Sequence, residues 1–341
     1  MGKITGSDSS IQTISSITNE NTLVVLLAGS SKVTLRQGIS AAGSTPELSF
    51  MTAVVDSEIM VHGRCESMSD PPMTPEGIPT PAIVSLACNS ILGLRIIVAD
   101  CGFRNFPRIP FFYSGIGPAE DPSTTTALPE FERSLEFGRY LGSLIRSLDN
   151  IVIAETVPGG TTTAQTVLRM LGSSAETSSS MINDPRDIKE EVVSMALKRC
   201  GRIEDPMMAV RETGDYTMSV ALSMLGELGD RNVIFAGGTQ MANILNLDRM
   251  INEPDGQRII ATTSWIMDHR GSAIRELVHD DDIVISRLDF SKFQYQGLRE
   301  YERGHVREGV GMGFFLGKAL LETGESRVYR AIDSTYEKFM K

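Results

Sequence analysis

Short runs of apolar residues recur along the chain, and each ends in a glycine-rich or polar break. Apolar runs of about four to eight residues are typical of strands buried inside a parallel sheet. Segments with helical spacing separate most of these runs. The repeated order of strand and helix predicts an α/β fold with a doubly wound, mostly parallel sheet of about six strands, in a Rossmann-like three-layer arrangement. The runs lie at residues 22–28, 94–99, 151–154, 232–236, 258–262 and 282–285.

Apolar residues at helical spacing predict the helices of this fold. Thr80 followed by Pro81 is a typical helix start, because threonine caps the helix and proline suits its first position. Residues 33–43 fit a helix or a loop, and residues 46–61 fit a segment that is helical early and extended later. The predicted helices cover residues 80–92, 129–148, 164–171, 187–199, 216–228, 239–250, 314–321 and 326–340.

Composition divides the chain into three parts. Residues 1–21 are polar and rich in serine and threonine, which predicts a flexible N-terminal arm. Residues 22–290 form the predicted nucleotide-binding core, and residues 31–92 are expected to contribute partly to a smaller helical lobe. Residues 291–341 hold a glycine-rich segment and further helices. The smaller lobe is therefore expected to combine segments near both ends of the chain.

The stretch from residue 150 to residue 171 carries the strongest chemical signal. Its strand ends in Glu155, a Pro-Gly-Gly turn follows, and three threonines open the next helix. This order directs backbone N–H groups and a helix dipole at one place, where an anion such as phosphate can bind. A tight strand-to-helix connection explains the turn equally well, because it matches no common phosphate-binding motif. The candidate substrate-binding residues are Gly159, Gly160, Thr161, Thr162 and Thr163.

The same order of strand, glycine turn and helix returns about eighty residues later. There the turn consists of Gly237, Gly238 and Thr239. Right-handed crossovers place the carboxyl ends of parallel strands at one edge of the sheet, where α/β proteins keep their ligands. The three residues are therefore expected to join Glu155 at one site.

A glycine-rich segment, GHVREGVGMG, surrounds Glu308 near the C-terminal end. Glycines at this density, including Gly309 and Gly311, suggest that the backbone approaches a ligand closely at the start of a helix. The local sequence favours a simpler alternative, an exposed first-turn glutamate that complements the helix dipole. Residues 172–180, GSSAETSSS, similarly fit a flexible flap over the site or, more simply, a surface loop.

Charge and cysteine usage exclude several classes of function. The chain of 341 residues has a formal net charge of −11 and no basic patch, which argues against nucleic-acid binding. Its four cysteines and four histidines form no metal-ligand pattern, so no metal is expected. Scattered cysteines fit a reduced cytoplasmic setting, and we expect no signal peptide and no membrane span.

Two motifs resemble segments of the nicotinate-nucleotide–dimethylbenzimidazole phosphoribosyltransferases. The stretch ETVPGGTTT from Glu155 resembles that family's Glu-x-x-x-Gly-x-Thr-Thr segment, and REGVGM from Arg307 resembles its Gly-Glu-Gly-Thr-Gly-Ala segment. The order and spacing agree over residues 22–322, and the chain looks closest to the archaeal-type branch. It departs from the family in the second glycine of the turn and in Arg307, which replaces a glycine beside the glutamate.

The resemblance implies a reaction and roles for the candidate residues. Nicotinate mononucleotide would give its phosphoribosyl group to a benzimidazole or purine-like base, forming an α-ribazole phosphate for the nucleotide loop of a cobamide (vitamin B12-type) cofactor. Glu308 would be the general base, and Glu155 would support the base or the ribose. The turn at residues 159–163 would hold phosphate or ribose, while Gly309 and Gly311 would let the backbone approach the nucleotide. The resemblance implies no cofactor and a symmetric homodimer.

Two other classes of function fit the same residues. A nucleotide N-glycosidic hydrolase would use Glu308 to activate water instead of an acceptor base. A non-catalytic protein could bind a nucleotide or base on the same fold, since fold does not fix function.

Overall fold

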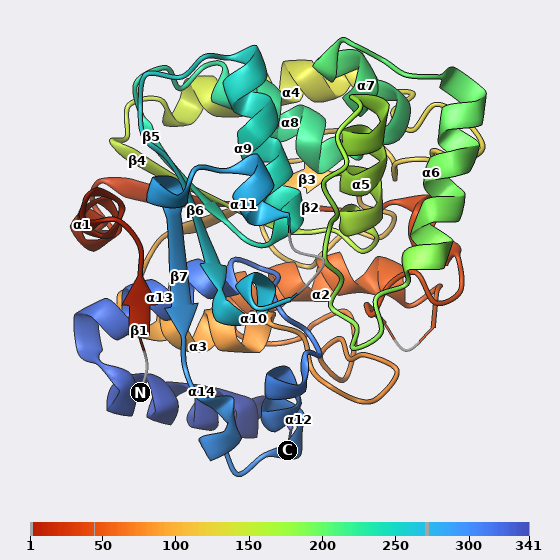
Figure 1. Ribbon diagram of the computed structural model, residues 1–341. Helices are drawn as coiled ribbons and strands as arrows, with labels where there is room; N and C mark the ends of the chain where they lie inside the picture. The colour runs from red at the N-terminus through yellow and green to blue at the C-terminus, as the bar shows by residue number, and fades with distance from the viewer. Residues whose placement is uncertain (1–2, 44, 270–272, 341) are drawn as a thin grey trace.

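The computed structural model describes residues 3–43, 45–269 and 273–340, which fold around one sheet (Figure 1). The sheet has seven strands in the order β1-β7-β6-β5-β4-β2-β3. All neighbours are parallel except β1 and β7. The predicted mostly parallel α/β sheet is therefore confirmed. The strands are β1 (Lys3–Thr5), β2 (Thr22–Gly29), β3 (Ile96–Cys101), β4 (Asn150–Thr156), β5 (Asn232–Ala236), β6 (Arg258–Thr263) and β7 (Ile283–Arg287).

The predicted helices flank the sheet at close to their expected positions, and the structure adds helices that were not predicted, among them α1 (Asp8–Ser16), α10 (Ser264–Met267), α11 (Ile274–Leu277) and α12 (Gln296–Arg299). The segment expected to change from helix to extended chain is helical throughout, as α2 (Ser49–His62), and α7 (Pro206–Thr213) was not predicted. The other helices are α3 (Ala82–Leu92), α4 (Phe131–Ile145), α5 (Gly160–Met170), α6 (Arg186–Cys200), α8 (Tyr216–Leu225), α9 (Thr239–Ile251), α13 (Met312–Thr323) and α14 (Glu325–Phe339). Short 3-10 turns lie at η1 (Lys32–Leu35), η2 (Asp280–Asp282), η3 (Phe290–Lys292) and η4 (Glu300–Arg303).

The N-terminal segment forms regular structure where a flexible arm was expected. β1 adds an antiparallel edge strand to β7, and α1 follows it. The hydroxyl groups of Ser7 and Ser10 both donate to the carbonyl oxygen of Asp281, at 2.6 and 2.7 Å. Ile14 and Ile17 are buried. The serines that suggested disorder thus serve as a helix cap and as anchors.

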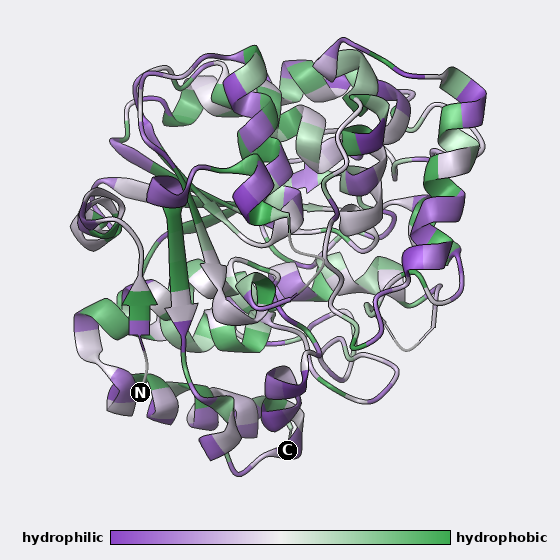
Figure 2. Ribbon diagram, viewed as in Figure 1, coloured by the Kyte–Doolittle hydropathy of each residue, from purple (hydrophilic) through white to green (hydrophobic). Residues whose placement is uncertain are grey.

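Both faces of the sheet are covered because successive strand residues point to opposite sides. In β4, Ile151 and Ile153 pack into the core beneath α4, α5, α8 and α9. Val152 and Ala154 pack on the other side, with α2, α3, α13 and α14. Helices from both ends of the chain therefore share one layer, below the sheet in Figure 1. Figure 2 shows the hydrophobic colour of β7 between these layers and hydrophilic stretches on the outer helix α6.

The strand order reverses direction between β2 and β4. The chain moves from β2 to β3 on one side and then returns past β2 to build β4, β5, β6 and β7 on the other. At such a switch point the connections leave the carboxyl ends of the two strands in opposite directions, which opens a crevice there. The fold therefore places a ligand site near Glu155, at the carboxyl end of β4 and close to the following glycine turn.

Candidate active site

A cleft runs across the carboxyl ends of the strands and has an empty volume of about 1000 Å³, counting the space at its mouth. One half lies against the first turns of α5 and α9. The other half lies against α2 and residues 72–81, on the opposite face of the sheet. Glu155 and Glu308 both line the cleft between these halves.

Glu308 is held in the cleft by backbone groups. Its carboxylate accepts hydrogen bonds from the N–H groups of Thr263, Gly309 and Gly313, at 3.1, 3.2 and 3.0 Å. The residue is only 8% exposed, so it is not the exposed first-turn glutamate favoured by the local sequence. Gly313 lies in the first turn of α13, which means that the carboxylate occupies the positive end of that helix. The side chain is therefore fixed in position before any ligand binds.

The loop that presents Glu308 is strained on both sides of it. Val306 has a φ of 49° and Val310 a φ of 53°, a left-handed region that branched residues rarely adopt. The Val306 N–H donates to the carbonyl oxygen of Ser180 at 2.9 Å, and the Val310 N–H donates to that of Glu155 at 3.0 Å. Strain of this kind persists only where the surroundings impose it, and it gathers at functional sites.

Three carboxyl groups line the cleft, and each has a raised pKa. Burial raises the pKa of Glu308 to about 7 against the opposing effect of its backbone hydrogen bonds. Burial, with nearby Asp215 and Glu308, raises the pKa of Glu155 to about 8. The third is Asp56 of α2, where burial raises the pKa to about 7. Each group can therefore exchange a proton near neutral pH.

The first turns of α5 and α9 form the other half of the cleft. Neither helix has a side-chain cap, and their N-cap residues are Gly159, with a φ of 82°, and Gly238. A side chain at Gly160 would collide with Gln240, because its Cβ would lie 1.9 Å from the amide oxygen. The small residues thus bring two helix starts together. Paired helix starts of this kind favour an anionic group.

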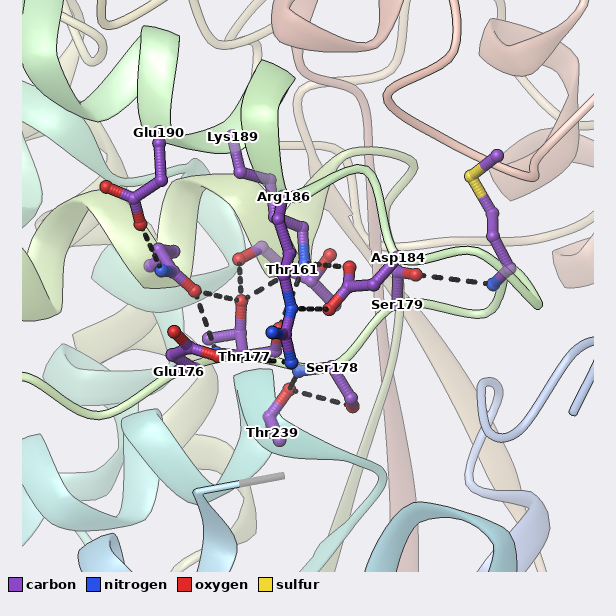
Figure 3. A network of polar contacts seen from close by, with 12 residues as sticks. Thr161, Glu176, Thr177, Ser178, Ser179, Asp184, Arg186, Lys189, Glu190 and Thr239 are labelled. Atoms are coloured by element: carbon purple, nitrogen blue, oxygen red, sulfur yellow. Dashed lines mark hydrogen bonds and ion pairs between the residues drawn. The ribbon is translucent and has the colours of Figure 1, made fainter. Parts of the chain in front are cut away.

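Residues 173–184 form an ordered wall beside these helix starts (Figure 3). The Thr177 hydroxyl donates to the Thr161 carbonyl oxygen at 2.6 Å, and the Ser178 N–H donates to the Thr239 hydroxyl at 3.2 Å. The buried Lys189 donates to the Thr177 carbonyl oxygen at 3.0 Å and pairs with Asp184 at 3.3 Å. The segment lines the cleft and is partly buried, so it is not the plain surface loop that its composition favoured.

Arg307 ties this wall to the loop of Glu308. Its guanidinium donates to the carbonyl oxygens of Ser179 and Met181. The side chain is only 5% exposed. The charge that sits next to Glu308 in the sequence is therefore directed into the wall.

Most of the predicted site residues line the cleft, and four do not. Thr163 donates its hydroxyl to Asp215 at 2.5 Å, and Thr162 is fully buried, because both face the core from α5. A Cβ at Gly237 would meet Met241, and one at Gly311 would meet Ala154 of the sheet. Those two glycines allow close packing. The residues that line the cleft are Glu155, Gly159, Gly160, Thr161, Gly238, Thr239, Glu308 and Gly309.

Sequence reasoning did not identify Asp56 as a site residue. Its carboxylate accepts hydrogen bonds from the hydroxyl groups of Thr80 and Thr156, at 2.7 and 2.8 Å. The one available signal in the sequence was the position of this acidic residue within a mostly apolar segment. The serines at 178–180 were also missed as lining residues, although their segment had been considered as a flap.

The described residues show neither a metal-binding cluster nor a membrane-spanning helix. No group of three or more histidine, cysteine, aspartate or glutamate side chains among them could hold a metal ion. Within the same residues, no helix has both the length and the apolar character needed to cross a membrane.

Comparison with known proteins gives relatives by sequence and by structure. No protein-family model matches the chain. The UPF0284 protein TV0153 of Thermoplasma volcanium is 44% identical over 324 residues, which cover 94% of this chain and 95% of that protein. The UPF0284 protein PF0303 of Pyrococcus furiosus is 36% identical over 302 residues, which cover 85% and 90%.

Two solved structures from Thermus thermophilus have the same fold. One is CobT, with a TM-score of 0.61 and 15% identity, covering 93% of this chain and 84% of that one. The other is described as nicotinate-nucleotide-dimethylbenzimidazole phosphoribosyltransferase, with a TM-score of 0.59 and 14% identity, covering 93% and 83%.

Proposed function

The chain belongs to the UPF0284 family, and on that premise we propose that it is a phosphoribosyltransferase. The proposed donor is nicotinate mononucleotide, and the acceptor is a benzimidazole or purine-like base. The product is an α-ribazole phosphate for the nucleotide loop of a cobamide. The fold shared with CobT is compatible with this reaction, and the motifs at Glu155 and Glu308 supply the residues for it.

The observation that carries the proposal is the placement of Glu308. Its carboxylate is buried and held by three backbone N–H groups, and its raised pKa suits a general base. It shares the cleft with two uncapped helix starts that favour a phosphate. A base and an anion site in one cleft are what a transfer from a nucleotide to a nitrogen heterocycle requires.

The proposed step needs no further reactant. One ring nitrogen of the acceptor attacks the anomeric carbon of the ribose, and the bond from that carbon to nicotinate breaks. The electron pair of the broken bond neutralises the pyridinium, and Glu308 takes the proton from the other ring nitrogen of the acceptor. Positive charge develops on the ribose during this exchange, and the carboxyl oxygens of Glu155 stabilise it, most strongly when Glu155 is ionised.

The electrostatics of the cleft also favour a donor with a positively charged pyridinium ring near the carboxyl groups. Among the described residues, no ion pair joins Asp56, Glu155 or Glu308 to a basic side chain, although such pairs occur elsewhere in the chain. A nucleotide with a pyridinium ring would bring a positive charge close to carboxyl groups that have no basic ion-pair partner among the described residues. This complementarity supports a donor whose leaving group is already cationic.

A turnover assay tests the proposal. Purified protein is mixed with nicotinate mononucleotide and, separately, with several bases, and α-ribotide and free nicotinate are followed by chromatography. We expect both products in equal amounts with at least one base. Release of nicotinate without α-ribotide would instead identify a hydrolase, and binding without consumption would identify a non-catalytic nucleotide-binding protein.

A further inference from the structure

The half of the cleft against α2 has apolar residues and several polar ones, and two of the polar side chains come from one face of α2. Thr52 and Asp56 are four residues apart in α2, so they lie on the same face, and both line the cleft. Pro72, Met73 and Ile78 line the same half. An apolar slot with a few fixed polar groups is typical of a site for a flat heterocycle.

Thr52 has an unused hydroxyl group there. Its Oγ1 is buried and has no hydrogen-bond partner within the described parts of the chain. A buried hydroxyl without a partner is unfavourable, and most such groups in proteins are paired. A ligand in this half of the cleft would supply the missing partner.

Asp56 can also accept a hydrogen bond from a ligand in the cleft. The hydroxyl groups of Thr80 and Thr156 each donate to a different oxygen of its carboxyl group. A carboxylate can accept about four hydrogen bonds, so one position on each oxygen remains. Thr80 and Thr156 therefore fix the orientation of Asp56 and leave it able to accept from a ligand.

The order of these groups along the cleft indicates that the acceptor base binds in the half against α2. The helix starts that favour a phosphate lie on the other face of the sheet, and Glu308 lies between the halves. A nucleotide bound with its phosphate at α5 and α9 would place its ribose near Glu155 and Glu308. The base that attacks the ribose must then occupy the half against α2.

We propose that Asp56 and Thr52 select an acceptor base whose six-membered ring carries a hydrogen-bond donor. The 6-amino group of adenine and the hydroxyl group of 5-hydroxybenzimidazole both meet this requirement. Dimethylbenzimidazole does not, because its methyl groups would leave the Thr52 hydroxyl group and the free acceptor positions of Asp56 without partners. The identification of this ligand as an acceptor rests on the proposed function.

Turnover with nicotinate mononucleotide and calorimetric binding are measured for adenine, 5-hydroxybenzimidazole and 5,6-dimethylbenzimidazole. We expect one of the two polar bases to exceed dimethylbenzimidazole by about tenfold or more in kcat/KM and in affinity, because a site built to hydrogen-bond a substrate rejects an analogue that lacks the group. The Thr52→Val and Asp56→Asn variants are expected to reduce the ratio of kcat/KM for the polar base to kcat/KM for dimethylbenzimidazole by about fivefold or more. Thr52→Ser, which keeps the hydroxyl group, is expected to preserve it.

Ser85 of α3 offers a matched control. Its hydroxyl oxygen is also buried without a partner among the described residues, but it does not line the cleft. Ser85→Ala should therefore leave the preference unchanged. A ratio that stays the same in Thr52→Val and Asp56→Asn, when each variant is folded by circular dichroism, would overturn the proposal.

Turnover and binding together distinguish a failure of this inference from a failure of the proposed function. Turnover in which dimethylbenzimidazole is the preferred acceptor would overturn the inference and leave the transferase standing. Absence of turnover with every base, combined with binding that still depends on Thr52 and Asp56, would support the selection of polar bases and overturn the transfer reaction.

Discussion

Asp56, Glu155 and Glu308 share one cleft, and the negative charges of Asp56 and Glu308 affect the pKa of Glu155. Burial is the largest cause of the raised pKa in each case, and repulsion from the other carboxyl groups adds to it at Glu155. Like charges in one buried cleft resist simultaneous ionisation. At neutral pH the cleft therefore holds both carboxylate and carboxylic acid, which can accept and donate hydrogen bonds to a substrate.

The raised pKa of Glu155 predicts a pH-dependent loss of stability. Its value of about 8 in the folded protein exceeds the ordinary 4.5, so the folded state holds a proton that the unfolded state loses between these values. The free energy of unfolding falls as pH rises through this window. We expect Glu155→Gln to raise the melting temperature by a few degrees at pH 8 and by much less at pH 5, in thermal unfolding followed by circular dichroism. An equal change at both pH values would contradict this account.

Helix geometry explains which of the predicted threonine side chains reach the cleft. Successive helix residues are rotated by about 100°, so neighbours in a threonine run face different directions. Thr161 lines the cleft, whereas Thr162 and Thr163 turn toward the core. The sequence motif indicated a segment that borders the cleft but could not assign the direction of each side chain.

At the scale of elements, the contact between α13 and β6 positions Glu308. A Cβ at Gly313 would lie 2.4 Å from the carbonyl carbon of Thr262 and 2.8 Å from a carboxylate oxygen of Glu308. We expect Gly313→Ala to lower the free energy of unfolding by about 1–3 kcal/mol, as overpacking does, and to reduce activity. Chemical denaturation and the turnover assay measure both effects.

Gly317 provides the control in the same helix. A Cβ there would meet its nearest neighbour, Ser286, at an ordinary 3.4 Å. Gly317→Ala should be neutral or should stabilise the protein by up to about 1 kcal/mol, because alanine favours a helix more than glycine does. Equal destabilisation by the two variants would rule out the close contact at Gly313 as the cause.

Arg307 connects the wall at residues 173–184 to the loop of Glu308. Arg307 holds two carbonyl oxygens of the wall, so Arg307→Met should leave them unpaired and loosen the nucleotide half of the cleft. We expect KM for the nucleotide to rise about tenfold, the effect of losing roughly 1.4 kcal/mol of binding, with a smaller change in kcat. Arg303, which is exposed and pairs with Glu300, supplies the control variant Arg303→Met. Equal effects of both variants on KM would contradict the role of Arg307.

At the scale of the whole molecule, the sequence predicted the sheet more fully than the site. Strands buried on both faces are long apolar runs, and these are visible without a structure. β1 escaped notice because it has only three residues and depends on pairing with β7. Asp56 escaped notice because its role depends on Thr156, which is distant in the sequence and meets it only when α2 packs across the end of β4.

The oligomeric state of the protein can also be predicted. We propose a symmetric homodimer, as the family resemblance implies, in a reduced cytoplasmic setting. Light scattering at micromolar concentration should then give twice the chain mass of 37.2 kDa. A mass equal to that of one chain would contradict the dimer and leave the account of the cleft intact.

The most direct test of the central claim is the Glu308→Gln variant, assayed for turnover and for nucleotide binding. The glutamine keeps the size of the side chain but cannot act as a general base at neutral pH. We predict that kcat falls by about two to four orders of magnitude, as expected when a general base is removed, while the affinity for the nucleotide changes little. Unchanged turnover, or loss of nucleotide binding in a folded variant, would contradict the catalytic role of Glu308.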